Sequence, residues 1–81
     1  MRCSIELQKE LVDSAANYQC VDDFLFSVGL DTSWMSDLMS ELGVNSDEQG
    51  CLVIFAELIK AYEAAHGIRF TDQERYDLLY N

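Results

Sequence analysis

The sequence contains no proline, only one histidine and only five basic residues. Without proline, helix ends must be set by glycines and by capping side chains. Its apolar runs fall far short of the roughly 20 residues that span a bilayer, so we expect no membrane segment. No stretch alternates apolar and polar residues over the length of a strand, so we expect no sheet.

Cysteine is scarce and its spacing does not indicate a structural role. Cys3, Cys20 and Cys51 form neither a CxxC pair nor a Cys/His ligand pattern, and an odd number cannot pair fully within one chain. The N-terminal residues lack the charged and apolar regions of a secretory signal. We therefore expect reduced thiols and a cytoplasmic location.

Residues suited to catalysis or metal binding are also few. His66 lies at the predicted end of a helix, where a histidine favours the negative end of the helix dipole. There is no GxSxG, HExxH or glycine-rich phosphate loop, so we expect neither an enzyme nor a cofactor. Residues 45–50 are similar to the start of a calcium loop. The twelfth position counted from Asn45 is Ala56, however, so we expect no metal.

What the sequence does contain is enough apolar material for a core. Hydrophobic residues make up 49% of the 81 positions, and nine residues are aromatic. Disordered chains combine high net charge with few apolar residues, so this composition favours a folded chain. We expect an all-α protein, a compact bundle of four to five helices that forms a single acidic domain over residues 1–81.

The first half of the chain predicts three helices. One covers residues 4–19, and its first residue, Ser4, is suited to cap it. A short one covers residues 22–28, with Asp22 or Asp23 as its cap and Gly29 as a left-handed end. Another runs to Leu42 after three candidate caps and is stopped by Gly43. The candidate caps are Asp31, Thr32 and Ser33.

Two capping boxes mark the remaining helices. Ser46 and Gln49 open a helix of about twenty residues that ends near His66, which predicts the central element of the fold. Thr71 and Glu74 form the second box and open a short terminal helix.

Negative charge is the strongest compositional signal. There are 15 acidic and 5 basic residues, for a formal net charge of −10, and no Lys or Arg lies between Lys9 and Lys60. A field of one sign repels nucleic acid and attracts basic protein surfaces. Residues 35–53 are similar to a helix-turn-helix, but the second helix would present Asp47 and Glu48 to phosphates. We therefore expect no direct binding of nucleic acid.

The charge pattern predicts a protein-binding module that acts as an inhibitor or adaptor by docking a basic surface of a partner, such as a nucleic-acid-binding surface. Small immunity proteins and phage-encoded inhibitors, including anti-CRISPR proteins, resemble this chain in size, acidity and helicity. Trp34, Tyr76 and Tyr80 are candidate aromatic anchors, although Trp34 begins an apolar stripe typical of a core. The predicted partner-binding residues are the uncompensated carboxylates Asp22, Asp23, Asp31, Asp37, Glu41, Asp47 and Glu48.

Three alternatives stay open at this point. The acidity could serve solubility alone. Phe24, Leu25 and Phe26 are too crowded for one narrow helix face, so a symmetric homodimer could complete the core. Residues 42–46 resemble the stretch before the serine that bears the prosthetic group of acyl carrier proteins, which implies a carrier role for Ser46. Asp47 stands where that family has an apolar residue, so this alternative ranks below the dimer.

Overall fold

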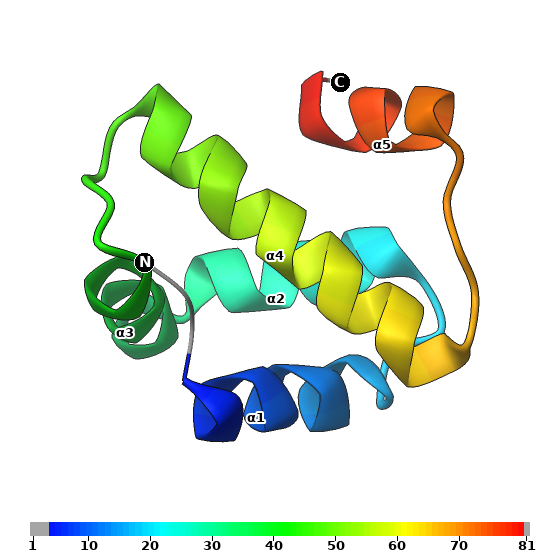
Figure 1. Ribbon diagram of the computed structural model, residues 1–81, viewed down its shortest axis with the longest axis horizontal. Coiled ribbons are helices and arrows are strands. Elements are labelled where there is room, and N and C mark those ends of the chain that lie inside the picture. Colours follow the sequence, from blue (N-terminus) through cyan, green and yellow to red (C-terminus); the bar gives the residue numbers. More distant parts are fainter. Residues whose placement is uncertain (1–3, 81) are drawn as a thin grey trace.

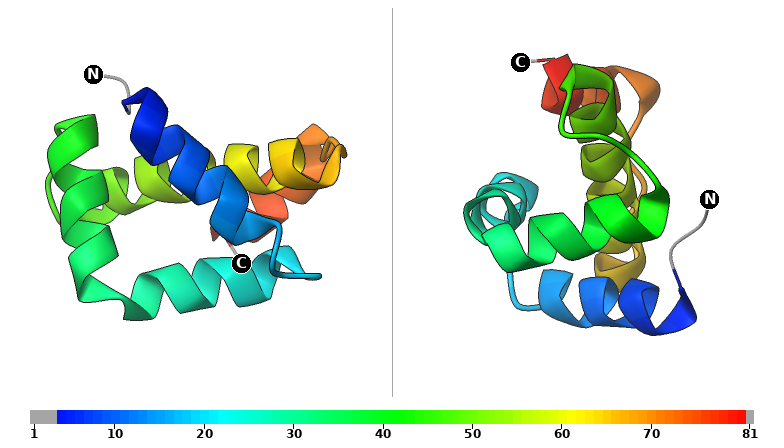
Figure 2. Two further views of the ribbon diagram at one scale, coloured as in Figure 1. Left: turned by 90° about the horizontal axis from the view of Figure 1, so that it is seen from below. Right: turned by 90° about the vertical axis from the view of Figure 1, so that its left-hand side faces the viewer.

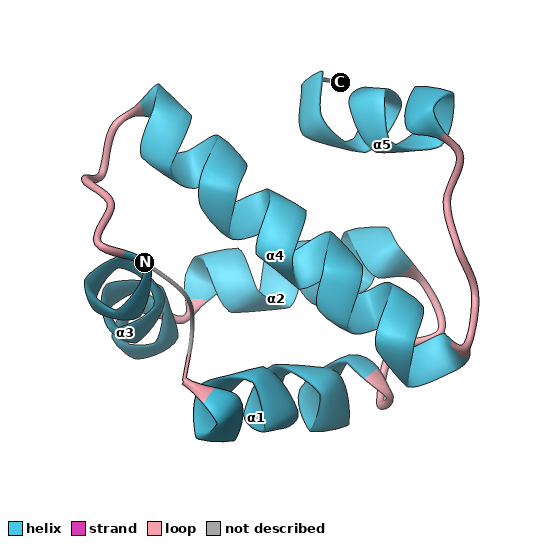
Figure 3. Ribbon diagram, viewed as in Figure 1, coloured by secondary structure: helices cyan, strands magenta, loops and turns pink. Residues whose placement is uncertain are grey.

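A computed structural model describes residues 4–80, and within this range the chain forms five helices and no strand (Figure 3). The predicted all-α bundle is therefore confirmed. In chain order the helices are α1 (Ile5–Ala15), α2 (Val21–Leu30), α3 (Thr32–Leu42), α4 (Glu48–His66) and α5 (Asp72–Tyr80).

Helix α4 is the centre of the bundle, as the sequence predicts. Each of the other four helices packs against it. It crosses the molecule diagonally in Figure 1, with α1 and α5 on opposite sides, and Figure 2 shows the same arrangement from two other directions. The first four helices supply every fully buried apolar side chain of residues 4–80, whereas α5 supplies none. The largest of these buried side chains are Phe24, Leu11, Leu38, Ile54, Leu58 and Ile59.

Several helix ends follow the local signals in the sequence. Ser4 Oγ accepts a hydrogen bond from the backbone N–H of the third residue of α1, at 3.2 Å. Asp31 Oδ1 accepts one from Trp34 N at 3.0 Å and thereby caps α3. Gly43 ends α3 with φ 67°, in the left-handed region that glycine adopts without steric cost. The predicted box of Thr71 and Glu74 is confirmed by reciprocal bonds of 2.9 and 3.1 Å.

The predicted ends of α2 are wrong on both sides. The helix begins at Val21 after Cys20, which makes no side-chain capping bond, so Asp22 and Asp23 lie inside the first turn. There they complement the helix dipole. At the other end, Gly29 lies within the helix and does not adopt a positive φ. The break comes at Asp31, whose extended backbone ends α2 while its carboxylate caps α3.

The predicted capping box of α4 is also wrong, by one residue. Asp47, and not Ser46, is the N-cap, and its Oδ1 accepts from Gly50 N at 2.7 Å. Gly50 is buried, and a Cβ at this position would overlap the carbonyl oxygen of Asn45. The preceding loop therefore folds back onto the first turn of α4. The contact lies beside the bond from Gly50 N to Asp47 that caps the helix.

The first helix is shorter than predicted, since α1 ends at Ala15 rather than near Gln19. The chain then turns so that the Tyr18 ring lies 5.7 Å from that of Phe24, and its hydroxyl bonds Ser27 at 2.7 Å. The His66 imidazole contacts the same turn at the end of α1. Its Nε2–H donates to the Ala15 carbonyl at 2.9 Å, and its ring stacks on Tyr62. His66 thus ties the end of α4 to the end of α1.

Helix α5 is attached to α4 through Glu63, a carboxylate only 8% exposed. Its oxygens accept from Arg75 Nη2 at 2.9 and 3.1 Å and from Phe70 N at 2.7 Å. Burial by itself raises the pKa of Glu63. The bonds from Arg75 and Phe70, together with the positive charges of Arg75 and Arg69, outweigh that effect and hold the pKa below its ordinary value.

Candidate functional site

The seven predicted partner-binding carboxylates lie at the surface: six are exposed and Glu41 is partly buried. Within residues 4–80, the ion pairs join Lys60 to Glu57 and Arg75 to Glu63. None of the seven carboxylates takes part in them. Their charges therefore face solvent without a cationic neighbour from the described part of the chain.

Three of the seven nevertheless have a structural role. Asp31 and Asp47 cap α3 and α4. Glu41 Oε2 accepts from the backbone N–H of Ser4 at 3.4 Å and so links α3 to the start of α1. The remaining four have no hydrogen-bond or ion-pair partner within the described residues and keep their full capacity for a partner. These four are Asp22, Asp23, Asp37 and Glu48.

The first acidic surface lies between α1 and α3. Glu6 and Glu10 of α1 line the same open depression, of about 380 Å³, as Asp37 and Glu41 of α3. Sequence reasoning missed Glu6 and Glu10 as site residues. Their spacing of four places them on one helix face, but only the tertiary arrangement of α1 and α3 places them around the same depression as the other two. Asp47 and Glu48 do not line this depression.

The second surface is the outer face of α2. Phe26 is 70% exposed and Leu30 is 68% exposed, and both line one shallow depression with Asp31. They lie four residues apart on one face of the helix. Asp22 and Asp23 precede them, so carboxylates flank this apolar pair at both ends. We call Phe26, Leu30 and these three carboxylates the α2 face.

The apolar run that suggested a dimer is divided by the fold. Phe24 is fully buried in the core, and Leu25 is partly buried against it. Only Phe26 points to solvent. Of the candidate aromatic anchors, Trp34 packs against the core, as its position in the stripe indicates. Tyr76 and Tyr80 of α5 are exposed and pack on each other, with ring centroids 4.7 Å apart.

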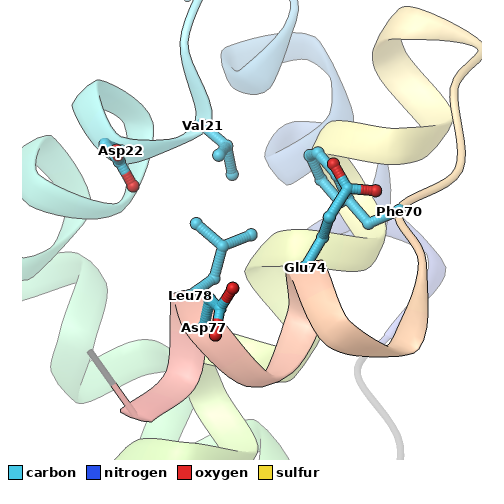
Figure 4. A pocket seen from close by; sticks show the side chains of 6 residues that line it. All are labelled: Val21, Asp22, Phe70, Glu74, Asp77 and Leu78. Carbon is cyan, nitrogen blue, oxygen red and sulfur yellow. The ribbon is translucent and has the colours of Figure 1, made fainter.

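The third surface is a groove between the start of α2 and α5, with a volume of about 490 Å³ (Figure 4). Its apolar lining consists of Val21, Phe70 and Leu78, and Figure 4 shows the Val21 and Leu78 side chains pointing toward one another. Three carboxylates also line it: Asp22, Glu74 and Asp77. Only Asp22 was among the predicted residues, because the packing of α5 on α4, which places α5 across the groove from the start of α2, has no local signal. We call this the α2–α5 groove.

The described residues contain no cluster of side chains suited to bind a metal ion. Across residues 4–80, no three His, Cys, Asp or Glu side chains are placed to hold a metal ion. Cys20 is exposed and Cys51 is partly buried, each as a free thiol, while Cys3 lies outside the described residues. In the same part of the chain, no helix has the length and apolar character needed to cross a membrane.

Comparison of the chain with protein-family models, with curated proteins and with solved structures found no match. A function for this chain therefore has to be inferred from its own surfaces and charges.

Proposed function

We propose that this chain is a protein-binding module that docks a basic surface of a partner protein and acts as an inhibitor or adaptor. The α2 face is the observation that carries the proposal. A surface that served solubility alone would have no need for a phenylalanine and a leucine that are each about two-thirds exposed. An apolar centre with a charged rim is the usual anatomy of a protein interface.

The electrostatics support a basic partner. Asp22 and Asp23 have no cationic neighbour among the described residues, and the formal net charge of the chain is −10. Such a field accelerates encounter with a basic surface and disfavours acidic competitors. The same field repels nucleic acid, which favours a protein as the partner.

The test begins with affinity capture from the native host and continues with the purified captured protein. Association kinetics at several salt concentrations are compared for the wild type, for Asp22→Asn/Asp23→Asn and for Asp13→Asn/Asp72→Asn. Both variants remove two exposed negative charges, so they change the net charge equally. Only the first alters the α2 face.

We expect Asp22→Asn/Asp23→Asn to slow association several-fold and to weaken its salt dependence, because charge complementarity acts mainly on the association rate. The control should bind nearly as the wild type does. Equal slowing by both variants would mean that net charge alone matters. Unchanged binding by both, and by Phe26→Ser/Leu30→Ser, would contradict the proposal.

Exposed Phe26 and Leu30 also favour a second candidate, self-association through the α2 face. A two-fold axis there would bring the carboxylates of two copies together, and their repulsion opposes such a dimer at low salt. Light scattering separates the two candidates. A dimer that persists at low salt and is abolished by Phe26→Ser would establish self-association, whereas a monomer is expected for the binding module.

A further inference from the structure

The α2–α5 groove combines two properties that few ligands satisfy together. Val21, Phe70 and Leu78 offer apolar surface, while the carboxylates of Asp22, Glu74 and Asp77 line the same space (Figure 4). An apolar ligand would leave the carboxylate of Asp22 without a counter-charge, and a small hydrated cation would leave the apolar walls uncovered. A suitable ligand therefore has an aliphatic part and a positive end.

No basic residue of residues 4–80 lines this groove. Arg75 belongs to α5, but its guanidinium is held by Glu63 at 2.9 and 3.1 Å. Asp22 has no hydrogen-bond or ion-pair partner among the described residues. Glu74 Oε1 accepts from Thr71 N, and Asp77 Oδ1 accepts from Gln73 Nε2. A carboxylate offers about four lone-pair sites, so Glu74 retains acceptor capacity beyond its bond from Thr71.

We propose that the α2–α5 groove binds one arginine side chain of a partner protein. Long basic side chains lay their aliphatic stems on apolar surface while the charged head reaches polar groups. Arginine suits this groove better than lysine because its planar guanidinium bonds carboxylates through two N–H groups at once and packs on aromatic surface such as Phe70. The volume of about 490 Å³ falls among pockets that hold small ligands, roughly 300–1,000 Å³.

This inference rests on the proposed function, since it identifies one contact that a basic partner would make. It also names a site separate from the exposed Phe26–Leu30 pair, because neither residue lines the groove. Asp22 belongs to both surfaces and connects them. A partner that covers α2 could therefore insert an arginine beside α5.

The experiment is an NMR titration of the isotope-labelled full chain at low salt, with the α-acetyl, C-terminal amide derivative of arginine as the probe. The matching citrulline derivative has the same shape without the charge. The derivative of 2-amino-3-guanidinopropionic acid has the charge on a shorter stem, and a lysine derivative tests the head group. The variants are Asp22→Asn and, as a matched control, Asp23→Asn, which removes an adjacent exposed charge that does not line the groove.

We expect the arginine derivative to shift the methyl signals of Val21 and Leu78 in a saturable way. The citrulline, short-stem and lysine derivatives should bind several-fold more weakly, and Asp22→Asn should weaken binding while Asp23→Asn should not. Shifts spread over all exposed carboxylates, equal binding of citrulline or of the short stem, or equal effects of the two variants would each overturn the proposal. Equal binding of lysine would overturn the preference for arginine.

The titration uses no partner, so its failure is distinguishable from failure of the proposed function. A titration without groove binding, combined with slowed partner association in Asp22→Asn/Asp23→Asn, would retain the binding module and reject the groove. Groove binding by the arginine derivative, combined with unchanged partner binding in Asp22→Asn/Asp23→Asn, in the control and in Phe26→Ser/Leu30→Ser, would retain the groove as an arginine site and reject the binding module.

Discussion

Replacing Glu63 by glutamine would test what holds α5 on the bundle. The residue is buried on α4, and its oxygens accept from Arg75 Nη2 and from the backbone of Phe70. Glutamine keeps the size of the side chain and can still accept from Phe70 N. It removes the negative charge, however, and one arrangement of its amide directs an NH₂ group at the guanidinium.

The expected cost follows from this geometry. Hydrogen bonds to charged groups contribute about 1.5–3 kcal/mol each. Arg75 is 37% exposed, so water replaces part of what the guanidinium loses. We expect Glu63→Gln to lower the free energy of unfolding by about 1.5–3 kcal/mol in total. For a domain of this size, that corresponds to a fall in melting temperature on the order of 10 °C.

Chemical denaturation and hydrogen exchange would measure the effect, with Glu57→Gln as the control. Glu57 makes the same kind of ion pair from the same helix, but its partner Lys60 is 69% exposed and 3.4 Å away. Surface pairs of this kind contribute at most about 0.5 kcal/mol. The loss of amide protection in Glu63→Gln should be greatest in α5, because no residue of α5 is fully buried.

The same substitution has a signature in pH. The pKa of Glu63 is lower in the folded chain than its ordinary value of 4.5, so proton binding favours the unfolded state. The stability that Glu63 contributes is present above pH 4.5 and is lost as the pH falls through the folded pKa. The difference in unfolding free energy between wild type and Glu63→Gln should therefore shrink as the pH falls below about 4.5. Equal losses in Glu63→Gln and Glu57→Gln, or a difference between wild type and Glu63→Gln that grows as the pH falls below 4.5, would refute this account.

Three further predictions are tested by chemical or thermal denaturation. Gly29→Ala should raise the free energy of unfolding by up to about 1 kcal/mol, because Gly29 is helical with open space around it. Gly50→Ala should lower it by about 1–3 kcal/mol, because the added Cβ displaces Asn45. A lower free energy of unfolding in Gly29→Ala would show that α2 ends at Gly29. His66→Leu should cost about 1 kcal/mol, since the Ala15 carbonyl loses one donor and keeps Tyr18 N; an unchanged free energy would show that this bond contributes nothing. Chelator and reductant should leave the melting temperature unchanged, and a fall with either would indicate a metal or a disulfide.

Some helix ends could be predicted from the sequence because their evidence lies within a few residues. The reciprocal pair of Thr71 and Glu74 closes over three residues. For α3 the sequence limited the cap to Asp31, Thr32 or Ser33, and the bond from Trp34 N identifies Asp31. Gly43 ends α3 because its backbone conformation favours glycine wherever it occurs. The all-α class and the central position of α4 followed from such local signals and from apolar spacing.

Local signals did not distinguish neighbouring candidates of similar strength. Ser46 and Asp47 are both good caps. Asp47 is the cap in the structure, where the backbone of Asn45 packs against Gly50. This contact is possible because glycine has no side chain. Gly29 is a residue type that often ends helices, but α2 continues through it to Leu30. Asp31 both ends α2 and caps α3.

The grouping of surface residues from different helices was decided by tertiary structure alone. The sequence showed that the carboxylates lack nearby cations, because charge can be counted along a chain. It could not show that Glu6 and Glu10 line the same depression as Asp37, since that depends on how α1 and α3 are placed around the core. Nor could it show that Leu78 faces Val21 across a groove. Helix ends depend on contacts between near neighbours, whereas a binding surface depends on how whole helices dock, and that is set by the shared core around α4.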